Sequence, residues 1–150
     1  MIPRQHKFHP MLLVSIAFFS FLLNLFWEVI HESFLYKTHM MPSFSHPVVI
    51  LYATLVDTFY IVLVYALVAL FLRNGIWVKK MPMNATLLFC VGVFIVSLLI
   101  EVRGVYIVHS WSYDSMMPTL FGIGISPMLQ LVTTGILSLW LTKKLMRSVI

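Results

Sequence analysis

The sequence alternates long apolar stretches with shorter and more polar connections. A helix needs about 20 mostly apolar residues to cross a bilayer, and four stretches reach that length. The predicted spans cover about residues 11–30, 48–72, 85–108 and 120–142. No connection is long enough to hold another domain. We therefore predict an all-α integral membrane bundle of four transmembrane helices in up-down-up-down order, forming one domain over residues 1–150.

Two of these stretches carry local irregularities. The first resembles a signal peptide, but it is too long for the apolar part of one and no small-residue cleavage site follows, so we expect it to be retained. In the fourth, Pro127 should either kink the helix or begin its regular part. Gly122 and Gly124 just before it predict an irregular, even re-entrant, start of that span.

Composition supports a membrane protein. The chain is 61% hydrophobic and only 10% charged, whereas a soluble domain carries about 25% charged residues. The single cysteine, Cys90, leaves no disulfide framework and no thiolate metal site. The basic residues lie at the ends of apolar runs and form no patch with interleaved aromatic residues, so nucleic acid is not an expected partner.

The basic residues also predict an orientation. Of the ten Lys and Arg residues, only Lys37 and Arg103 fall on the side away from the termini. The positive-inside rule then places both termini in the cytoplasm of a multi-pass protein of the inner (plasma) membrane. All acidic residues fall within the membrane or on its outer side. These are Glu28, Glu32, Asp57, Glu101 and Asp114.

A weak repeat relates the two halves. Residues 25–29 and 98–102 both end a span with a Glu, and Met-Met-Pro follows in each outer loop, at residues 40–42 and 116–118. Such a repeat predicts two hairpins related by a pseudo-twofold axis along the membrane normal. The alternative is coincidence, since methionine is frequent in this chain.

Polar residues within the spans are the candidates for function. Asn24, Glu28 and His31 follow the i, i+4, i+7 spacing of one helix face, with Trp27 beside them. A charge at membrane depth costs roughly 2.5–3.5 kcal/mol, so such groups tend to face protein or water and to mark function. The alternative is that Glu28 and His31 mark the interface, and that Glu32 is simply solvated.

Asp57 lies near the predicted midplane with apolar residues on both sides and Tyr60 one turn away, within reach of a hydrogen bond. It has two interpretations. It is structural if it pairs with Arg103 or is hydrogen-bonded by Asn24 or Gln130. Otherwise it is a proton carrier, a cation ligand or a catalytic acid.

Glu101 and Arg103 should point to different sides of their helix because they are two residues apart. We therefore expect Arg103 to pair with Glu28 or Asp57 on another helix.

Three further residues have open roles. Gln130 could use a carbonyl freed by the proline, or line a site. Trp111 and Tyr113 suit an aromatic belt at the interface or the mouth of a cavity.

Metal sites are not predicted. Glu28-x-x-His31 is half of a di-iron signature, but Gly104 stands where the second motif, starting at Glu101, needs a histidine. Thioether and imidazole groups suit copper, and several lie in the outer loops, although methionine is also ordinary interfacial filler. These are His39, Met40, Met41, His46, His109, Met116 and Met117. No cofactor can be assigned.

The chain resembles a group of small bacterial four-span membrane proteins of unassigned function. The residues that carry this resemblance are Asn24, Trp27, Glu28, Asp57, Glu101, Trp111, Tyr113, Met117, Pro118, Gly122, Gly124, Pro127 and Gln130. Fainter likenesses are to the emopamil-binding (sterol isomerase) superfamily, whose His-x-x-x-Glu is absent here, and to lycopene-cyclase domains, whose acid pair is replaced at Gln130. Both likenesses imply lipid chemistry, with Glu28, His31, Asp57 and Glu101 filling roles comparable to those of sterol-site residues.

Three functions follow as hypotheses. The first is an enzyme or binding protein for an apolar lipid or isoprenoid, with proton transfer by acidic side chains, charge stabilisation by Arg103 and Gln130, and stacking by Trp27. The second is a non-catalytic subunit or assembly factor that joins a membrane-protein partner or another copy of itself. The third is ion, proton or copper handling, against which stands the inner half of the spans, where no polar path completes the crossing. The catalytic candidates are Glu28, Asp57 and Glu101, and the binding candidates are Asn24, Trp27, His31, Tyr60, Arg103, Trp111, Tyr113 and Gln130.

Overall fold

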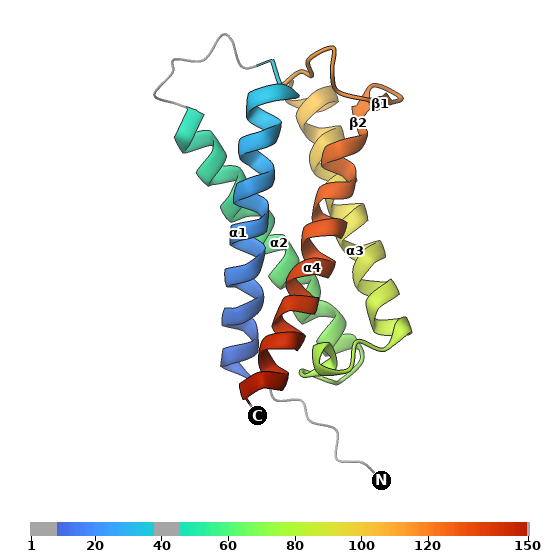
Figure 1. The fold of residues 1–150 in the computed structure, drawn as a ribbon. Helices are drawn as coiled ribbons and strands as arrows, with labels where there is room; N and C mark the ends of the chain where they lie inside the picture. Colours follow the sequence, from blue (N-terminus) through green and yellow to red (C-terminus); the bar gives the residue numbers. More distant parts are fainter. Residues whose placement is uncertain (1–8, 38–45, 150) are drawn as a thin grey trace.

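The computed structural model describes residues 9–37 and 46–149 and contains four long helices that run alternately up and down (Figure 1). They are α1 (Pro10–Phe34), α2 (His46–Phe71), α3 (Met83–Val102) and α4 (Ile125–Val149). Each is long and apolar enough to cross a membrane when α3 is continued through Ile107. The predicted all-α bundle of four spanning helices is therefore confirmed.

Three spans begin and end close to the predicted residues, but α4 begins at Ile125 instead of residue 120. The preceding residues form a small antiparallel hairpin of β1 (Thr119–Leu120) and β2 (Ile123–Gly124). Its turn holds Phe121 and Gly122 at positive φ, 50° and 73°. Pro127 lies in the first turn of α4, where its missing N–H has no helical partner to lose. It therefore begins the regular helix and does not kink it.

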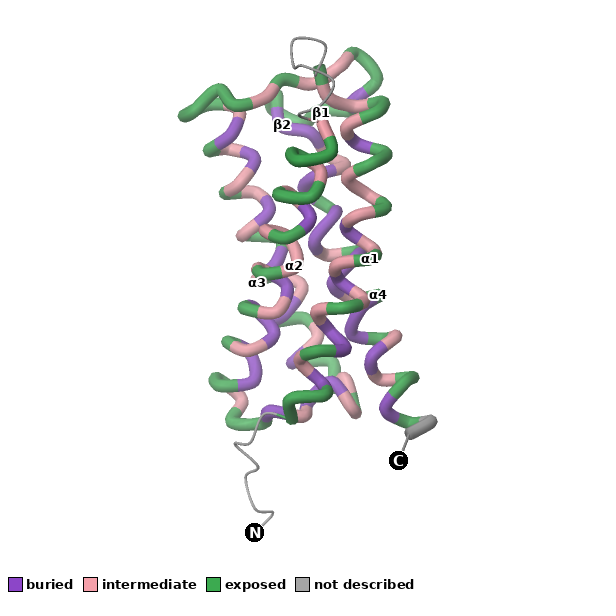
Figure 2. Tube along the Cα trace, turned by 90° about the vertical axis from the view of Figure 1, so that its left-hand side faces the viewer, coloured by how far each residue is buried: buried purple, intermediate pink, exposed green. Residues whose placement is uncertain are grey.

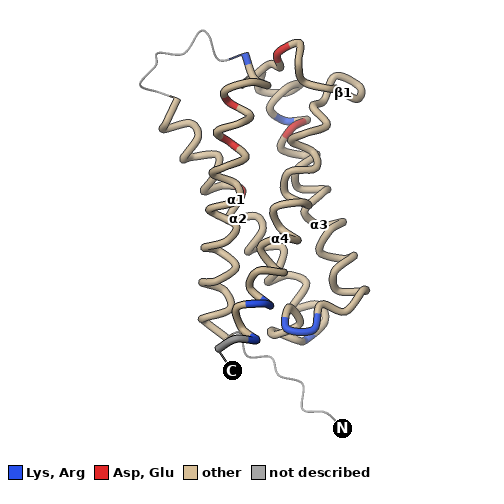
Figure 3. The backbone as a smooth tube through the Cα atoms, in the orientation of Figure 1, with Lys and Arg blue, Asp and Glu red and all other residues tan. Residues whose placement is uncertain are grey.

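The two ends of the bundle differ in charge (Figure 3). Arg73, Lys79, Lys80 and the Lys and Arg residues of α4 lie where α1 begins and α4 ends, which we call the basic end. The acidic residues lie toward the opposite end, the acidic end. This segregation is the pattern from which the orientation was predicted, although Arg4 and Lys7 fall outside the described residues, as do Met40 to Pro42 of the predicted repeat.

The apolar core occupies the basic half. In α2, Ile61, Tyr65 and Val68 are buried there against Trp77 and Phe89, with the rings of Tyr65 and Trp77 stacked 5.2 Å apart. Outward-facing positions along the bundle remain exposed and apolar, as expected for lipid contact (Figure 2).

The acidic half of α2 is packed more loosely. Between His46 and Asp57 only Thr54 is buried. Helix α2 runs obliquely behind α1 (Figure 1) and packs more closely on α1 than on α3. This leaves room for a cavity beside α2 in the acidic half.

Candidate functional site

Glu28 of α1 and Asp57 of α2 meet at the side-chain amide of Gln130 on α4. Gln130 Nε2 donates to Glu28 Oε1 and to Asp57 Oδ2, each at 2.6 Å. An amide nitrogen carries two hydrogens, so these short contacts use both. The two carboxyl groups therefore lie side by side, bound to one amide nitrogen. We call Glu28 and Asp57 the carboxyl pair.

The amide is held in place by the packing of α1 on α4. Asn24, one turn before Glu28, accepts a hydrogen bond from Thr134 at 3.0 Å and lies 3.3 Å from Gln130 Nε2. Its own amide donates to the carbonyl of Ser20 at 2.9 Å. Asn24 is fully buried, so these contacts satisfy polar atoms that would otherwise be costly. The hydrogen bond from Gln130 is the one that a structural role of Asp57 predicted. Asp57 also lines a cavity, so the same carboxyl group is open to a ligand as well as bonded to the bundle.

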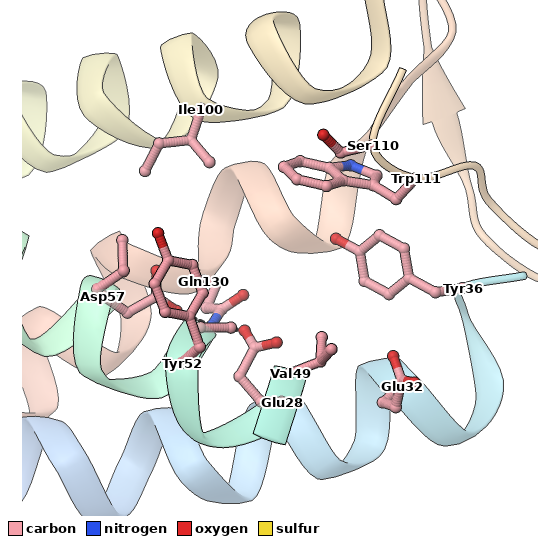
Figure 4. A pocket seen from close by; sticks show the side chains of 12 residues that line it. Glu28, Glu32, Tyr36, Val49, Tyr52, Asp57, Ile100, Ser110, Trp111 and Gln130 are labelled. Carbon is pink, nitrogen blue, oxygen red and sulfur yellow. Dashed lines mark hydrogen bonds between the residues drawn. The ribbon is translucent and has the colours of Figure 1, made fainter. Parts of the chain in front are cut away.

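A cavity of about 210 Å³ lies beside the carboxyl pair (Figure 4). Its wall comes from all four helices and the loop after α3. The lining residues are Glu28, Glu32, Tyr36, Val49, Tyr52, Ala53, Val56, Asp57, Ile100, Ser110, Trp111 and Gln130. Figure 4 shows the carboxyl pair with Gln130 toward one end and Tyr36 with Trp111 toward the other. Chemical groups for proton transfer therefore adjoin a largely apolar space.

Glu101 forms a second polar centre behind the cavity. Its carboxylate is 4% exposed and accepts hydrogen bonds from Trp111 Nε1 at 3.3 Å, from the Tyr36 hydroxyl at 3.4 Å, and from the Tyr113 hydroxyl. Burial raises the pKa of Tyr36 well above its ordinary value and also raises the pKa of Tyr113. Both phenols therefore stay protonated and remain donors. We call Tyr36, Trp111 and Tyr113 the roof.

The roof also joins the ends of two connections. Tyr36 and Tyr113 form an isolated β-bridge. Lys37 N donates to the Ser112 carbonyl, and Asp114 N donates to the Leu35 carbonyl, both at 2.9 Å. The side chains on Glu101 and this backbone pairing together fix the loop after α3 over the end of α1.

Gly104 gives the roof its space. It lies in the π-helix Arg103–Ile107 that ends α3, and a Cβ at this position would lie 2.0 Å from Cζ2 of Trp111. Only a glycine lets the indole approach closely enough to reach Glu101. The glycine that excluded a second Glu-x-x-His motif thus has a packing role.

His31 lies apart from the cavity wall. Its Nε2 accepts from Trp27 Nε1 at 2.6 Å and lies 2.8 Å from Ser126 Oγ. Because an indole N–H can only donate, Nε2 is the acceptor and Nδ1 carries the proton. The imidazole is therefore neutral and buried, and its Nδ1 has no partner among the described residues. Through these contacts His31 links Trp27 of α1 to Ser126 at the start of α4.

Two predicted site residues lie elsewhere. Arg103 is exposed and forms no ion pair with the described residues, which corrects the expected pairing with Glu28 or Asp57. Glu101 faces inward, so a residue two positions later faces outward. Tyr60 forms no hydrogen bond with Asp57 within the described structure, because its ring packs against the apolar core.

Glu32 is not merely solvated. It lines the cavity and pairs with His46 at 2.6 Å, joining the end of α1 to the start of α2.

The copper-suited residues are not brought together in the described structure. His46 pairs with Glu32, and His109 Nδ1 donates to the Val105 carbonyl at 2.8 Å. His39, Met40 and Met41 lie outside the described residues.

Sequence reasoning missed two groups of residues. Tyr36 follows the first span and joins the site only through loop pairing, which leaves no signal in the sequence. Buried hydroxyls also extend into the basic half, at Ser20, Ser138 and Thr142. Their spacing of four from Asn24 and Gln130 could have revealed them. Polar side chains are therefore also present in the basic half of the bundle, where the sequence predicted no polar path.

Comparisons of the chain with protein-family models, curated proteins and solved structures find no match. The likenesses given above stay predictions, and function is argued from the geometry of the site.

Proposed function

We propose that the protein binds the end of an apolar lipid or isoprenoid molecule in this cavity and exchanges a proton with it through the carboxyl pair. The supporting observation is that two carboxyl groups share one amide in the wall of a largely apolar space. A pair holding one proton contains both an acid and a base. Such a pair suits reactions that add a proton at one carbon and remove one at another, such as a double-bond shift.

The size of the cavity argues for partial enclosure of the ligand. Pockets that enclose whole drug-sized ligands measure about 300–1,000 Å³, whereas this one measures about 210 Å³. The roof covers it at the acidic end, and Tyr52 on α2 lines it while remaining 70% exposed. We infer that the ligand enters sideways past α2, with its remaining chain in the bilayer.

The charge of the cavity limits the ligand further. Glu28, Glu32 and Asp57 line it, and no Lys or Arg does so among the described residues. An anionic group would meet carboxyl groups without a countercharge, so phosphate and carboxylate head groups are disfavoured. The rings of Tyr52 and Trp111 favour hydrocarbon and would stabilise a positive charge that develops during protonation.

The proposed roles differ from those expected from sequence in one respect. Glu28 and Asp57 transfer the proton, and Gln130 positions them. Glu101 is absent from the cavity lining, and its oxygens are occupied by the roof. We therefore assign Glu101 a positioning role, because it holds Tyr36 and Trp111 against the cavity. With the basic end in the cytoplasm, the cavity faces the outer leaflet.

Deuterium incorporation tests the proposal even though the substrate is unidentified. The purified protein is placed in vesicles containing an apolar lipid extract of its host membrane, in D₂O, and lipids are analysed by high-resolution mass spectrometry. One lipid class should gain deuterium at carbon, and Asp57→Asn or Glu28→Gln should abolish the gain. Thr133→Val, on the exposed face of α4, is the matched control. No incorporation by wild-type protein with bound lipid would contradict proton transfer.

A second candidate, a subunit of a larger membrane complex, is favoured by Phe121. Its side chain is 88% exposed at the tip of the hairpin, and its φ of 50° is costly for a residue of this kind. Such a residue suits contact with a partner. Phe121→Ser should then abolish co-purification of that partner, whereas unchanged isolation as a single species would argue against this function.

A further inference from the structure

A row of buried hydroxyl groups continues from the carboxyl pair toward the basic end. Helices α1 and α4 are antiparallel, and Glu28 contacts Gln130 while Asn24 contacts Thr134. Each step of four residues advances one turn on both helices. The same register places Ser20 opposite Ser138 and Ile16 opposite Thr142. Ser20, Thr134, Ser138 and Thr142 are all buried.

Two of these hydroxyls are unpaired. Ser20 Oγ and Thr142 Oγ1 have no hydrogen-bond partner among the described residues, and both residues are fully buried. Helical Ser and Thr often bond the carbonyl four residues earlier, as Thr133 does here. A buried hydroxyl without a partner costs about 1–3 kcal/mol. That cost disappears if a water molecule bridges the group to its neighbours.

We propose that the seam between α1 and α4 holds a chain of water molecules that carries protons between the basic end and the carboxyl pair. Each hydroxyl or water accepts one proton and releases another, so no net charge is left in the seam. Asn24 and Gln130 orient the last water beside the pair. Thr142 begins the path, next in sequence to Lys143, whose Nζ donates to the Lys80 carbonyl at the basic end.

The surroundings of the carboxyl pair favour this route over others. Tyr36 and Trp111 line the cavity toward the acidic end, and the proposed entry past the exposed Tyr52 faces hydrocarbon, which carries no protons. A simple packing role for small polar residues does not explain why two hydroxyls remain unpaired. This inference deepens the proposed function by naming the source of its protons, but its test needs no lipid, so either can fail alone.

Hydrogen–deuterium exchange at the carboxyl pair tests the path. The infrared carbonyl band of the protonated pair is assigned with Asp57→Asn, and its shift is followed after transfer of reconstituted protein into D₂O. The double variant Ser20→Ala with Thr142→Val should exchange at least tenfold more slowly than wild type, while Thr133→Val exchanges normally. Equal rates in the double variant and the control would overturn the proposal.

Thermal unfolding gives a second readout, available even if the double variant does not fold. Thr142→Val keeps the shape of the side chain and removes only the hydroxyl. In a dry seam, loss of an unpaired hydroxyl should raise Tm. In a hydrated seam, Tm should not rise, because the hydroxyl is bonded to water. A higher Tm for Thr142→Val would therefore overturn the proposal.

Discussion

Trp111 packs its indole directly against the Cα of Gly104, so closely that a methyl group there would lie 2.0 Å from Cζ2 and 2.2 Å from Cη2. This contact allows the loop after α3 to pack against the end of α3, where backbone pairing with the end of α1 also holds it. It brings Trp111 Nε1 to Glu101, and through Glu101 it fixes Tyr36 and Tyr113. The shape of the cavity therefore depends on one residue without a side chain.

Gly104→Ala should displace the indole and open the roof. Overpacking of this kind costs about 1–3 kcal/mol. Because Trp111 would move toward water, its fluorescence should shift to longer wavelength, and the shift should be absent when Trp111→Phe is added.

Gly92→Ala is the matched control for this substitution. A Cβ at Gly92 would lie 2.8 Å from Cγ1 of Val64, a buried and β-branched side chain that moves little. Gly92→Ala should therefore also overpack the bundle but leave Trp111 in place. The absence of a fluorescence shift in Gly104→Ala, as in Gly92→Ala, would show that the roof does not depend on Gly104.

Gln130→Leu should destabilise the protein by about 1–3 kcal/mol, because two partly buried carboxyl groups lose their shared donor. Asp57→Asn supplies an amide that can donate to Glu28, so the double variant should recover part of the loss. Thermal unfolding of the four proteins in the cycle measures the coupling, expected at about 0.5–3 kcal/mol. Additive effects would mean that Gln130 does not act through the pair.

The roof should make the fold sensitive to strong alkali. The pKa of Tyr36 and that of Tyr113 are raised, chiefly by burial, so the folded protein holds these protons more tightly than the unfolded chain. Their stabilisation is complete below the ordinary tyrosine pKa of about 10 and is lost as the pH rises above it. Unfolding followed by tyrosinate absorbance should show this loss. In the variant Tyr36→Phe with Tyr113→Phe, the decline above this pH should be smaller.

The sequence predicted the bundle and much of the polar cluster because both follow from helical periodicity. The lengths of the apolar stretches predicted the four spans. The spacing of Asn24 and Glu28 placed both residues on one face of the first helix. The positions of Asp57 and Gln130 along their spans then placed both residues at a similar depth in the membrane. Periodicity could not assign a partner across the bundle to Arg103, which faces outward while Glu101 faces inward. The carboxyl pair of Glu28 and Asp57 is therefore held by Gln130 and not by Arg103.

The remainder of the site could not be predicted because it depends on loops. Glu101 has the sequence context of a catalytic acid, but Tyr36 donates to its Oε1, and Trp111 and Tyr113 donate to its Oε2. The contribution of Tyr36 requires a β-bridge between segments far apart in the sequence, and no local pattern encodes that pairing. By sequence, Trp111 and Tyr113 suit an interfacial belt or a cavity mouth, and only the structure shows that both donate to Glu101.

The cavity should discriminate between ligands of equal length by charge. A brominated fatty alcohol that enters beside Trp111 should quench its fluorescence, whereas the corresponding fatty acid, ionised at neutral pH, should need at least about tenfold higher concentration, equivalent to about 1.4 kcal/mol. The reason is that Glu28, Glu32 and Asp57 line the space without a neighbouring Lys or Arg among the described residues. Subtracting the signal of Trp111→Phe isolates this site from the other tryptophans. Asp57→Asn should narrow the difference by removing one acidic group, and equal quenching by alcohol and acid in the wild type would refute an acidic cavity that selects against anions.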